Sequence, residues 1–293
     1  MLDSTLIVLT VLFTTASSMV SKSYEVRHPG NGALFFSSLR CFFAALFFIF
    51  VGGFRLHFVP ELIPYLIAFG VSYGTATAAG YFAIRTGPLS LSSLITSYSL
   101  IVPTLYGLIF LNEGVEWFFY VGLSLVLISI FLMRKKGKSS LTEEGKVKIG
   151  PLWILSVALA FIGNGLCSTF QTAQQKAFLG EYKTELMVFS LLAVSLALAV
   201  ISVFTERGTI KKTFKSCLPY SLLYGIFNGA VNLFVMMLTG GGRLSAAIIF
   251  PTISAGGIIA TMSVAVLVYK ERLSKWQITS LILGVFAVIL MNL

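Results

Sequence analysis

Uncharged polar side chains recur at regular spacing inside stretches of sequence that are otherwise apolar. In FIGNGLCSTFQTAQQK, Asn164, Ser168, Gln171 and Gln175 follow one another at spacings of four, three and four residues. Positions three or four apart share one face of a helix, so these side chains form a polar stripe. Their amides and hydroxyls can hydrogen-bond a polar solute, but they include no acid, base or metal ligand for catalysis. The stripe predicts either the lining of a cavity or a hydrogen-bond network between helices.

Two other segments carry polar residues at matching places. Residues 63–90 and 218–245 align at an offset of 155 positions, with seven identical residues among 28. The identical pairs are Pro64/Pro219, Tyr65/Tyr220, Gly70/Gly225, Gly74/Gly229, Gly87/Gly242, Leu89/Leu244 and Ser90/Ser245. In this alignment Tyr73 corresponds to Asn228, and Thr77 corresponds to Asn232. An amide that faced lipid would be costly, so we expect these side chains to face protein or water.

The glycines of the two aligned segments form GxxxG sequences, GVSYG at 70–74 and GIFNG at 225–229. Glycines four residues apart leave one helical face without side chains, so another helix can approach closely. They indicate either tight packing alone, or two helices that meet at a symmetry axis and form part of a central cavity.

We expect the polar residues of several such segments to assemble one substrate-binding site. Its candidate residues are Ser17, Ser18, Tyr73, Thr77, Tyr98, Asn164, Ser168, Gln171, Asn228 and Asn232. Ser17 and Ser18 are included because a weaker internal alignment matches them to Asn164 and its neighbour. Tyr98 is included because Pro103 follows it, and a proline within an apolar span bends or breaks the helix, often beside a binding site.

Charged residues are scarce inside the apolar stretches. All eleven acidic residues lie in loops or at the ends of these stretches, so we expect no mechanism based on a carboxylate at the membrane midplane. Glu113 and Glu271 stand at short turns, where each is expected to cap the N-terminus of the following helix. Arg40 lies well inside an apolar stretch. It either pairs with an anionic substrate or hydrogen-bonds to neighbouring carbonyls.

The composition indicates a membrane protein. The chain of 293 residues is 57% hydrophobic and 11% charged, whereas soluble domains carry about 25% charged residues. Its apolar runs are long enough to cross a hydrocarbon core of roughly 30 Å, and they lack the period-two alternation of a membrane β-barrel. The net charge of +10 then reflects basic loops rather than nucleic-acid binding. The three cysteines show no CxxC spacing and the two histidines share no motif, so no metal or other cofactor is expected.

The elements that must position these residues are membrane-spanning helices. We predict an all-α polytopic membrane protein with ten transmembrane helices, arranged as two inverted five-helix repeats. The predicted spans are 3–20, 33–52, 62–84, 90–111, 115–133, 151–172, 183–204, 218–239, 244–268 and 273–292. The polar loop 134–150 divides the chain into repeats at 1–133 and 151–293. Because five is odd, the second repeat enters the membrane from the opposite side, which is characteristic of secondary transporters.

The distribution of basic residues predicts an orientation. Sixteen of the 21 lysines and arginines fall in the loops after spans 1, 3, 5, 7 and 9, and four fall in the other loops. The positive-inside rule then places the loop 134–150 in the cytoplasm and both termini outside.

The end of each half resembles a known unit. Residues 81–133, from YFAIRTGPLSLSSL through Pro103 and Glu113 to a last apolar span, resemble the EamA-type unit of the drug/metabolite transporter superfamily. The stretch that begins LSAAIIFPTISAGG and continues through Glu271 repeats it, although Pro251 lies 20 residues before Glu271 and Pro103 only 10 before Glu113. The resemblance implies a ten-span inner-membrane carrier for small metabolites that works by alternating access. It also implies cytosolic termini, against the count of basic residues.

The expected function is therefore that of a permease in the cell (inner) membrane, with no enzyme activity. Its partners would be the lipid bilayer and a small metabolite, such as an amino acid or a related polar compound, and the protein would be a monomer or a homodimer. The alternative is a non-transporting membrane scaffold or receptor, which would need a partner surface that the short loops hardly offer. An intramembrane enzyme would need acid, base or metal ligands at one depth, and no His, Asp or Glu lies mid-span.

Overall fold

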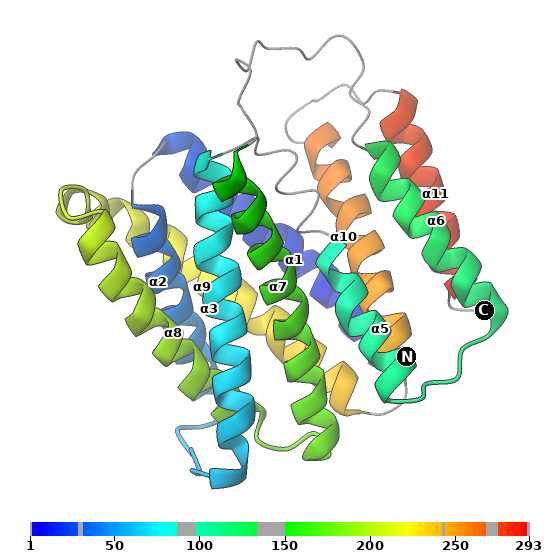
Figure 1. The fold of residues 1–293 in the computed structure, drawn as a ribbon, viewed down its shortest axis with the longest axis horizontal. Coiled ribbons are helices and arrows are strands. Elements are labelled where there is room, and N and C mark those ends of the chain that lie inside the picture. Colours follow the sequence, from blue (N-terminus) through cyan, green and yellow to red (C-terminus); the bar gives the residue numbers. More distant parts are fainter. Residues whose placement is uncertain are drawn as a thin grey trace.

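The computed structural model describes residues 2–28, 32–86, 98–133, 150–241, 244–267 and 275–291. Every regular element within these residues is a helix, and the helices stand side by side in one bundle (Figure 1). The elements are α1 (Leu2–Arg27), α2 (Ala33–Val51), η1 (Pro60–Leu62), α3 (Ile63–Thr86), η2 (Tyr98–Leu100), α5 (Ile101–Phe110), α6 (Trp117–Met133), α7 (Pro151–Ala177), α8 (Lys183–Thr205), α9 (Ile210–Gly240), α10 (Ala246–Leu267) and α11 (Lys275–Met291). The predicted all-α class is confirmed for this part of the chain.

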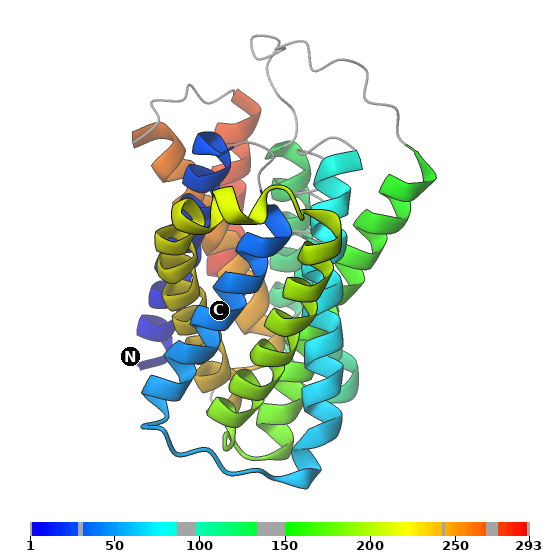
Figure 2. The ribbon, with the colours of Figure 1, turned by 90° about the vertical axis from the view of Figure 1, so that its left-hand side faces the viewer.

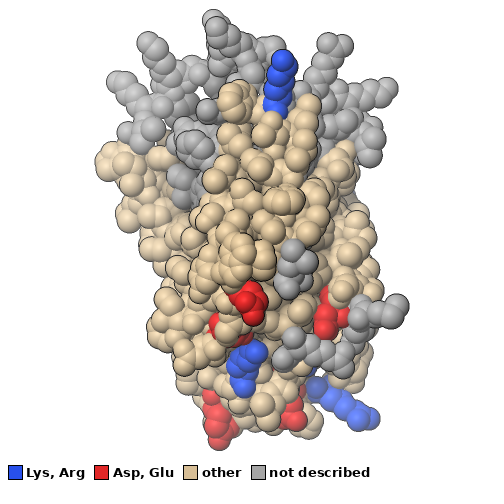
Figure 3. Space-filling view, turned by 90° about the vertical axis from the view of Figure 1, so that its right-hand side faces the viewer, with Lys and Arg blue, Asp and Glu red and all other residues tan. Residues whose placement is uncertain are grey.

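Six helices of the described part are long and apolar enough to cross a membrane. They cover Asp3–Ser21, Ala33–Val51, Pro60–Ala83, Pro151–Ala177, Lys183–Thr205 and Thr213–Gly240. The remaining predicted spans hold shorter apolar helices, among them Ile101–Phe110 and Ala246–Gly257. On the face shown in Figure 3, a broad uncharged band separates the charged side chains near the two ends. The protein is thus a multi-pass membrane protein, while the crossing of all ten helices stays a prediction.

The helices differ from the predicted spans in their bounds and in where their prolines lie. The helix α9 begins at Ile210, eight residues before the predicted span 218–239, and continues through Pro219. The predicted span 90–111 is described only from residue 98. There Pro103 lies in the first turn of α5, where a missing backbone N–H leaves no helical hydrogen bond unmade. In α10, by contrast, Pro251 lies inside the helix.

The two halves of the chain interlock rather than stand apart. The closest pairings join α3 with α7, α6 with α11, α2 with α8, and α1 with α9. Each pair combines one helix from residues 1–133 with one from residues 151–293. In Figure 1, α6 and α11 form one edge of the bundle together. The hydrophobic core is therefore shared between the halves: its largest cluster includes Phe48 of α2, Phe69 of α3, Leu186 of α8 and Met236 of α9.

Acidic side chains from one half cap helices of the other half. The carboxylate of Glu206 accepts hydrogen bonds from the backbone N–H groups of Leu34 and Phe35 at the start of α2, both at 3.1 Å. The carboxylate of Glu113 accepts one from the N–H of Ala247 at the start of α10, at 3.0 Å. We expected Glu113 to cap the helix that follows it in sequence, α6. Tertiary packing instead brings it to α10, because α5 and α10 lie side by side. Glu271 lies outside the described residues.

Candidate substrate-binding site

The aligned residues Tyr73 and Asn228 contact each other. The Asn228 side-chain amide donates a hydrogen bond to the Tyr73 hydroxyl at 3.3 Å, which joins α3 to α9. One turn further along α9, the Asn232 amide donates to the backbone carbonyl of Asn228 at 2.8 Å. Both asparagines and Tyr73 are half-buried.

The polar stripe of α7 reaches the same place. Gln171, which is only 3% exposed, donates its side-chain amide to the backbone carbonyl of Asn232 at 3.2 Å. A longer contact of 3.5 Å joins the same amide to the Asn232 side-chain oxygen. Hydrogen bonds thus run from α7 through α9 to α3. The stripe forms a network between helices, one of the two arrangements that its spacing allows.

Asn164 joins the same face of α7 to the segment before α5. Its side-chain amide donates to the Ser99 hydroxyl of η2 at 2.6 Å, and Ser99 is fully buried. The next residue, Gly165, permits this approach. A Cβ there would lie 2.8 Å from the Ser99 carbonyl oxygen and 2.6 Å from a Val102 side-chain carbon. Ser168 is half-buried one turn further along α7.

A cationic side chain lies beside this network. The Arg40 guanidinium of α2 lies over the Tyr224 ring of α9, 4.8 Å from its centroid, which is within cation–π range. The positive charge of Arg40 also acts on the Tyr73 hydroxyl. Arg40 thus contributes positive charge beside the Tyr73 end of the network.

Among the candidates whose side chains are described, this network joins Tyr73, Gln171, Asn228 and Asn232. Ser17 is buried and donates its hydroxyl to the Thr14 carbonyl of its own helix at 2.8 Å, whereas Ser18 is exposed. Thr77 is half-buried one turn beyond Tyr73 on α3. Tyr98 begins η2, and its side chain lies outside the described part of the structure. The role of all ten candidates in substrate binding stays a prediction.

Sequence reasoning missed a reciprocal pair of serines. The Ser38 hydroxyl of α2 donates to the Ser195 carbonyl of α8 at 2.8 Å, and the Ser195 hydroxyl donates to the Ser38 carbonyl at 2.9 Å. The two residues are 157 positions apart, close to the offset of 155 that aligns the two halves. This near-match of offsets is the feature of the sequence from which the contact could have been predicted. Contacts in which equivalent residues exchange equivalent bonds are expected at a two-fold axis.

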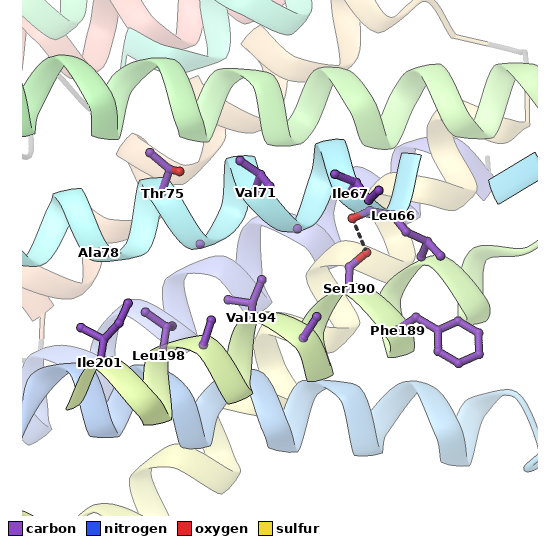
Figure 4. Close-up of a pocket in the computed structure, with 14 residues that line it drawn as sticks. Leu66, Ile67, Val71, Thr75, Ala78, Phe189, Ser190, Val194, Leu198 and Ile201 are labelled. Carbon is purple, nitrogen blue, oxygen red and sulfur yellow. Dashed lines mark hydrogen bonds between the residues drawn. The ribbon is translucent and has the colours of Figure 1, made fainter. Parts of the chain in front are cut away.

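The two GxxxG sequences have opposite surroundings. A Cβ on Gly225 would lie 2.5 Å from a Phe43 side-chain carbon, and one on Gly229 would lie 2.5 Å from the Phe47 ring, so α9 packs tightly against α2. On α3, a Cβ at Gly70 or Gly74 would meet its nearest neighbours at 3.8–3.9 Å. Those glycines line an apolar groove of about 640 Å³ between α3 and α8 (Figure 4).

Comparisons with known proteins identify a family for the first half of the chain. Residues 3–135 match the EamA-like transporter family, which confirms the resemblance seen in the sequence. A solved structure titled "Crystal structure of protein" superposes on 99% of this chain and 98% of its own, with a TM-score of 0.75 and 12% sequence identity. At that identity the likeness shows a shared fold alone. A search of curated proteins finds no match to this chain.

Proposed function

This chain carries an EamA-like transporter family domain over residues 3–135, and we propose that it is a permease for a small polar or zwitterionic metabolite, such as an amino acid. The network of Tyr73, Gln171, Asn228 and Asn232 is the observation that supports this proposal. It offers amide and hydroxyl groups from three helices at membrane depth, where a polar solute has few other partners. The solute would bind among these residues, with Asn164, Ser168, Thr77 and Tyr98 lining the route to them.

We further propose that the ten helices cross the cell membrane as two inverted repeats, 1–133 and 151–293, joined by the loop 134–150. Two equivalent pairs support a two-fold axis through the bundle: Ser38 with Ser195, and Tyr73 with Asn228. The helix pairings agree with this arrangement, since exchanging the halves converts α1–α9 into α7–α3 and α2–α9 into α8–α3, and all four pairs are in contact. The repeats would alternate between two packings and expose the site to each side in turn.

The first test is ligand binding by the purified protein. We expect one or more members of a panel of amino acids and related zwitterions to raise its unfolding midpoint by several degrees at saturating concentration. A panel without any effect would favour a scaffold or receptor over a carrier.

The second test is transport in liposomes with the compounds that stabilise the protein. We expect Asn164→Ala and Asn228→Ala to lower the flux at unchanged protein content. The matched control is Ser124→Ala, which removes an exposed hydroxyl on α6 that bonds only within its own helix. Normal flux through both asparagine variants would remove these residues from the site.

A further inference from the structure

The groove between α3 and α8 is suited to hydrocarbon. Seven residues of α3, from Leu66 to Ala78, and seven of α8, from Phe189 to Ile201, line its volume of about 640 Å³. None of them is charged, and only Thr75 and Ser190 carry a hydroxyl. The Ser190 hydroxyl is already used, because it donates to the Leu66 carbonyl at 3.2 Å (Figure 4). A bound water needs two to four polar partners, which these walls do not supply.

The groove lies at membrane depth and opens on the outer surface of the bundle. Both walls belong to helices that are long and apolar enough to span a bilayer. Ile67 and Val71, which line it, are 60% and 63% exposed. From Leu66 to Ala78 the helix rises about 18 Å, at about 1.5 Å per residue. The hydrocarbon of one leaflet is roughly 15 Å thick, half of the core. The groove therefore has about the length of one acyl chain.

The groove also distinguishes two interfaces, called seams here, that the alignment of the halves makes equivalent: α3 with α8, and α9 with α2. Exchanging the halves converts the α3–α8 seam into the α9–α2 seam. The α9–α2 seam is closed, with Gly225 and Gly229 against Phe43 and Phe47. In the α3–α8 seam a Cβ added at Gly70 or Gly74 would reach Ser190 or Val194 only at ordinary contact distances of 3.8–3.9 Å. An empty slot of this kind loses dispersion contacts along both walls, and an inserted hydrocarbon chain restores them.

We propose that the α3–α8 groove binds one acyl chain of a bilayer phospholipid, and that this chain stabilises the arrangement seen here. The occupant is bound by its shape and its hydrocarbon, since the walls offer no group to hold a charged headgroup. Binding to this arrangement and not to one in which the seam is closed shifts the balance between them toward the open seam. This site is separate from the polar network, so it stands whether or not that network binds a solute.

The test uses the full chain, purified in detergent and freed of lipid. Palmitoyl-oleoyl phosphatidylglycerol is then added, and native mass spectrometry counts the lipids retained per protein. We expect one retained phospholipid and a rise of several degrees in the unfolding midpoint. Glycerophosphoglycerol, which is the same headgroup without acyl chains, should have no effect. A rise caused by the deacylated headgroup would overturn the proposal.

Groove-filling variants from both walls make the test specific. Gly70→Leu on α3 and Ala197→Leu on α8 should each lower the retained phospholipid at least tenfold, and either one suffices if the other does not fold. The matched control is Gly80→Leu on α3, which lies beyond the groove with nothing within 4 Å of its added Cβ. It should retain the lipid. Equal retention by all three variants would overturn the proposal, as would a protein dimer that occupies the groove and excludes the lipid.

Discussion

The aligned glycines of α3 and α9 differ in how closely another helix packs against them. Gly225 and Gly229 allow α9 to approach α2, whereas Gly70 and Gly74 leave a groove between α3 and α8. The difference comes from the facing helix: α2 presents the rings of Phe43 and Phe47, and α8 presents Ser190 and Val194. The contribution of each glycine to stability therefore depends on the size of the side chain opposite it.

We predict that Gly225→Ala destabilises the protein and that Gly70→Ala does not. The new methyl group at residue 225 would lie 2.9 Å from the Ala44 nitrogen and 3.0 Å from the Arg40 carbonyl, and backbone cannot move aside cheaply. Overpacking of this kind costs about 1–3 kcal/mol. Denaturant or thermal unfolding in detergent measures the loss. An equal effect of the two substitutions would contradict the difference between the seams.

The bond between Tyr73 and Asn228 allows a second prediction at this scale. A double-mutant cycle with Tyr73→Phe and Asn228→Ala should give a coupling free energy of about 0.6 kcal/mol, and at most about 1.7 kcal/mol, the range for hydrogen bonds between membrane helices. Unfolding free energies of the wild type, the two single variants and the double variant supply the cycle. Strictly additive effects would mean that this bond contributes nothing to stability.

At the scale of the helices, a carboxylate from each half of the chain caps a helix of the other half. Glu206 caps α2, and Glu113 caps α10. A negative charge at a helix N-terminus satisfies free N–H groups and interacts favourably with the helix dipole. Glu113 also lies 3.8 Å from the Lys176 ammonium of α7. Space for its carboxylate comes from Gly107, where a Cβ would lie 2.6 Å from the nearer oxygen.

We predict that the cap, and not the ion pair, is the larger contribution of Glu113. Glu113→Ala removes the acceptor from the Ala247 N–H and should cost about 0.5–2 kcal/mol. Glu113→Gln keeps a carbonyl oxygen and should cost less. Lys176→Met is the control for the ion pair and should cost less than Glu113→Ala, because the 3.8 Å between the Lys176 ammonium and the Glu113 carboxylate is too long for a hydrogen bond. A loss with Lys176→Met as large as with Glu113→Ala would reverse this assignment.

At the scale of the whole molecule, successive connections alternate between the two ends of the bundle. Figures 1 and 2 show the connection 52–62 at one end and the turn 206–209 at the other. The alternation agrees with the sequence, in which basic residues gather in every second loop. An inverted second half follows directly if the first half has an odd number of crossings.

Thiol labelling tests the orientation of the whole molecule. The three native cysteines are buried, so single cysteines introduced at exposed sites report on each end. We predict that a membrane-impermeant maleimide labels His57→Cys on intact cells and labels Gly208→Cys only after the membrane is opened. The positive-inside rule gives this result. The opposite pattern would place the termini in the cytosol, as the family resemblance implied.

Much of the architecture could be predicted without the structure. The length of the apolar runs requires helices, because backbone N–H and C=O groups in lipid must be paired within the segment. The internal alignment at 155 positions paired Tyr73 with Asn228, and these residues are in contact. Ser18 shows the limit of that reasoning: a weak alignment matched it to Gly165, the neighbour of Asn164, but its side chain is exposed.

The sequence alone therefore determined the all-α membrane class and the internal alignment of the two halves, because hydropathy and repeat offsets can be read from the sequence without the fold. Only the tertiary structure decided which helices meet. It brought Glu113 to α10 rather than to α6, joined Gln171 to Asn232, and closed one glycine seam while leaving the other open. These outcomes depend on the side chains that face each helix across the bundle. The spacing of residues along one helix does not predict which helix packs against it.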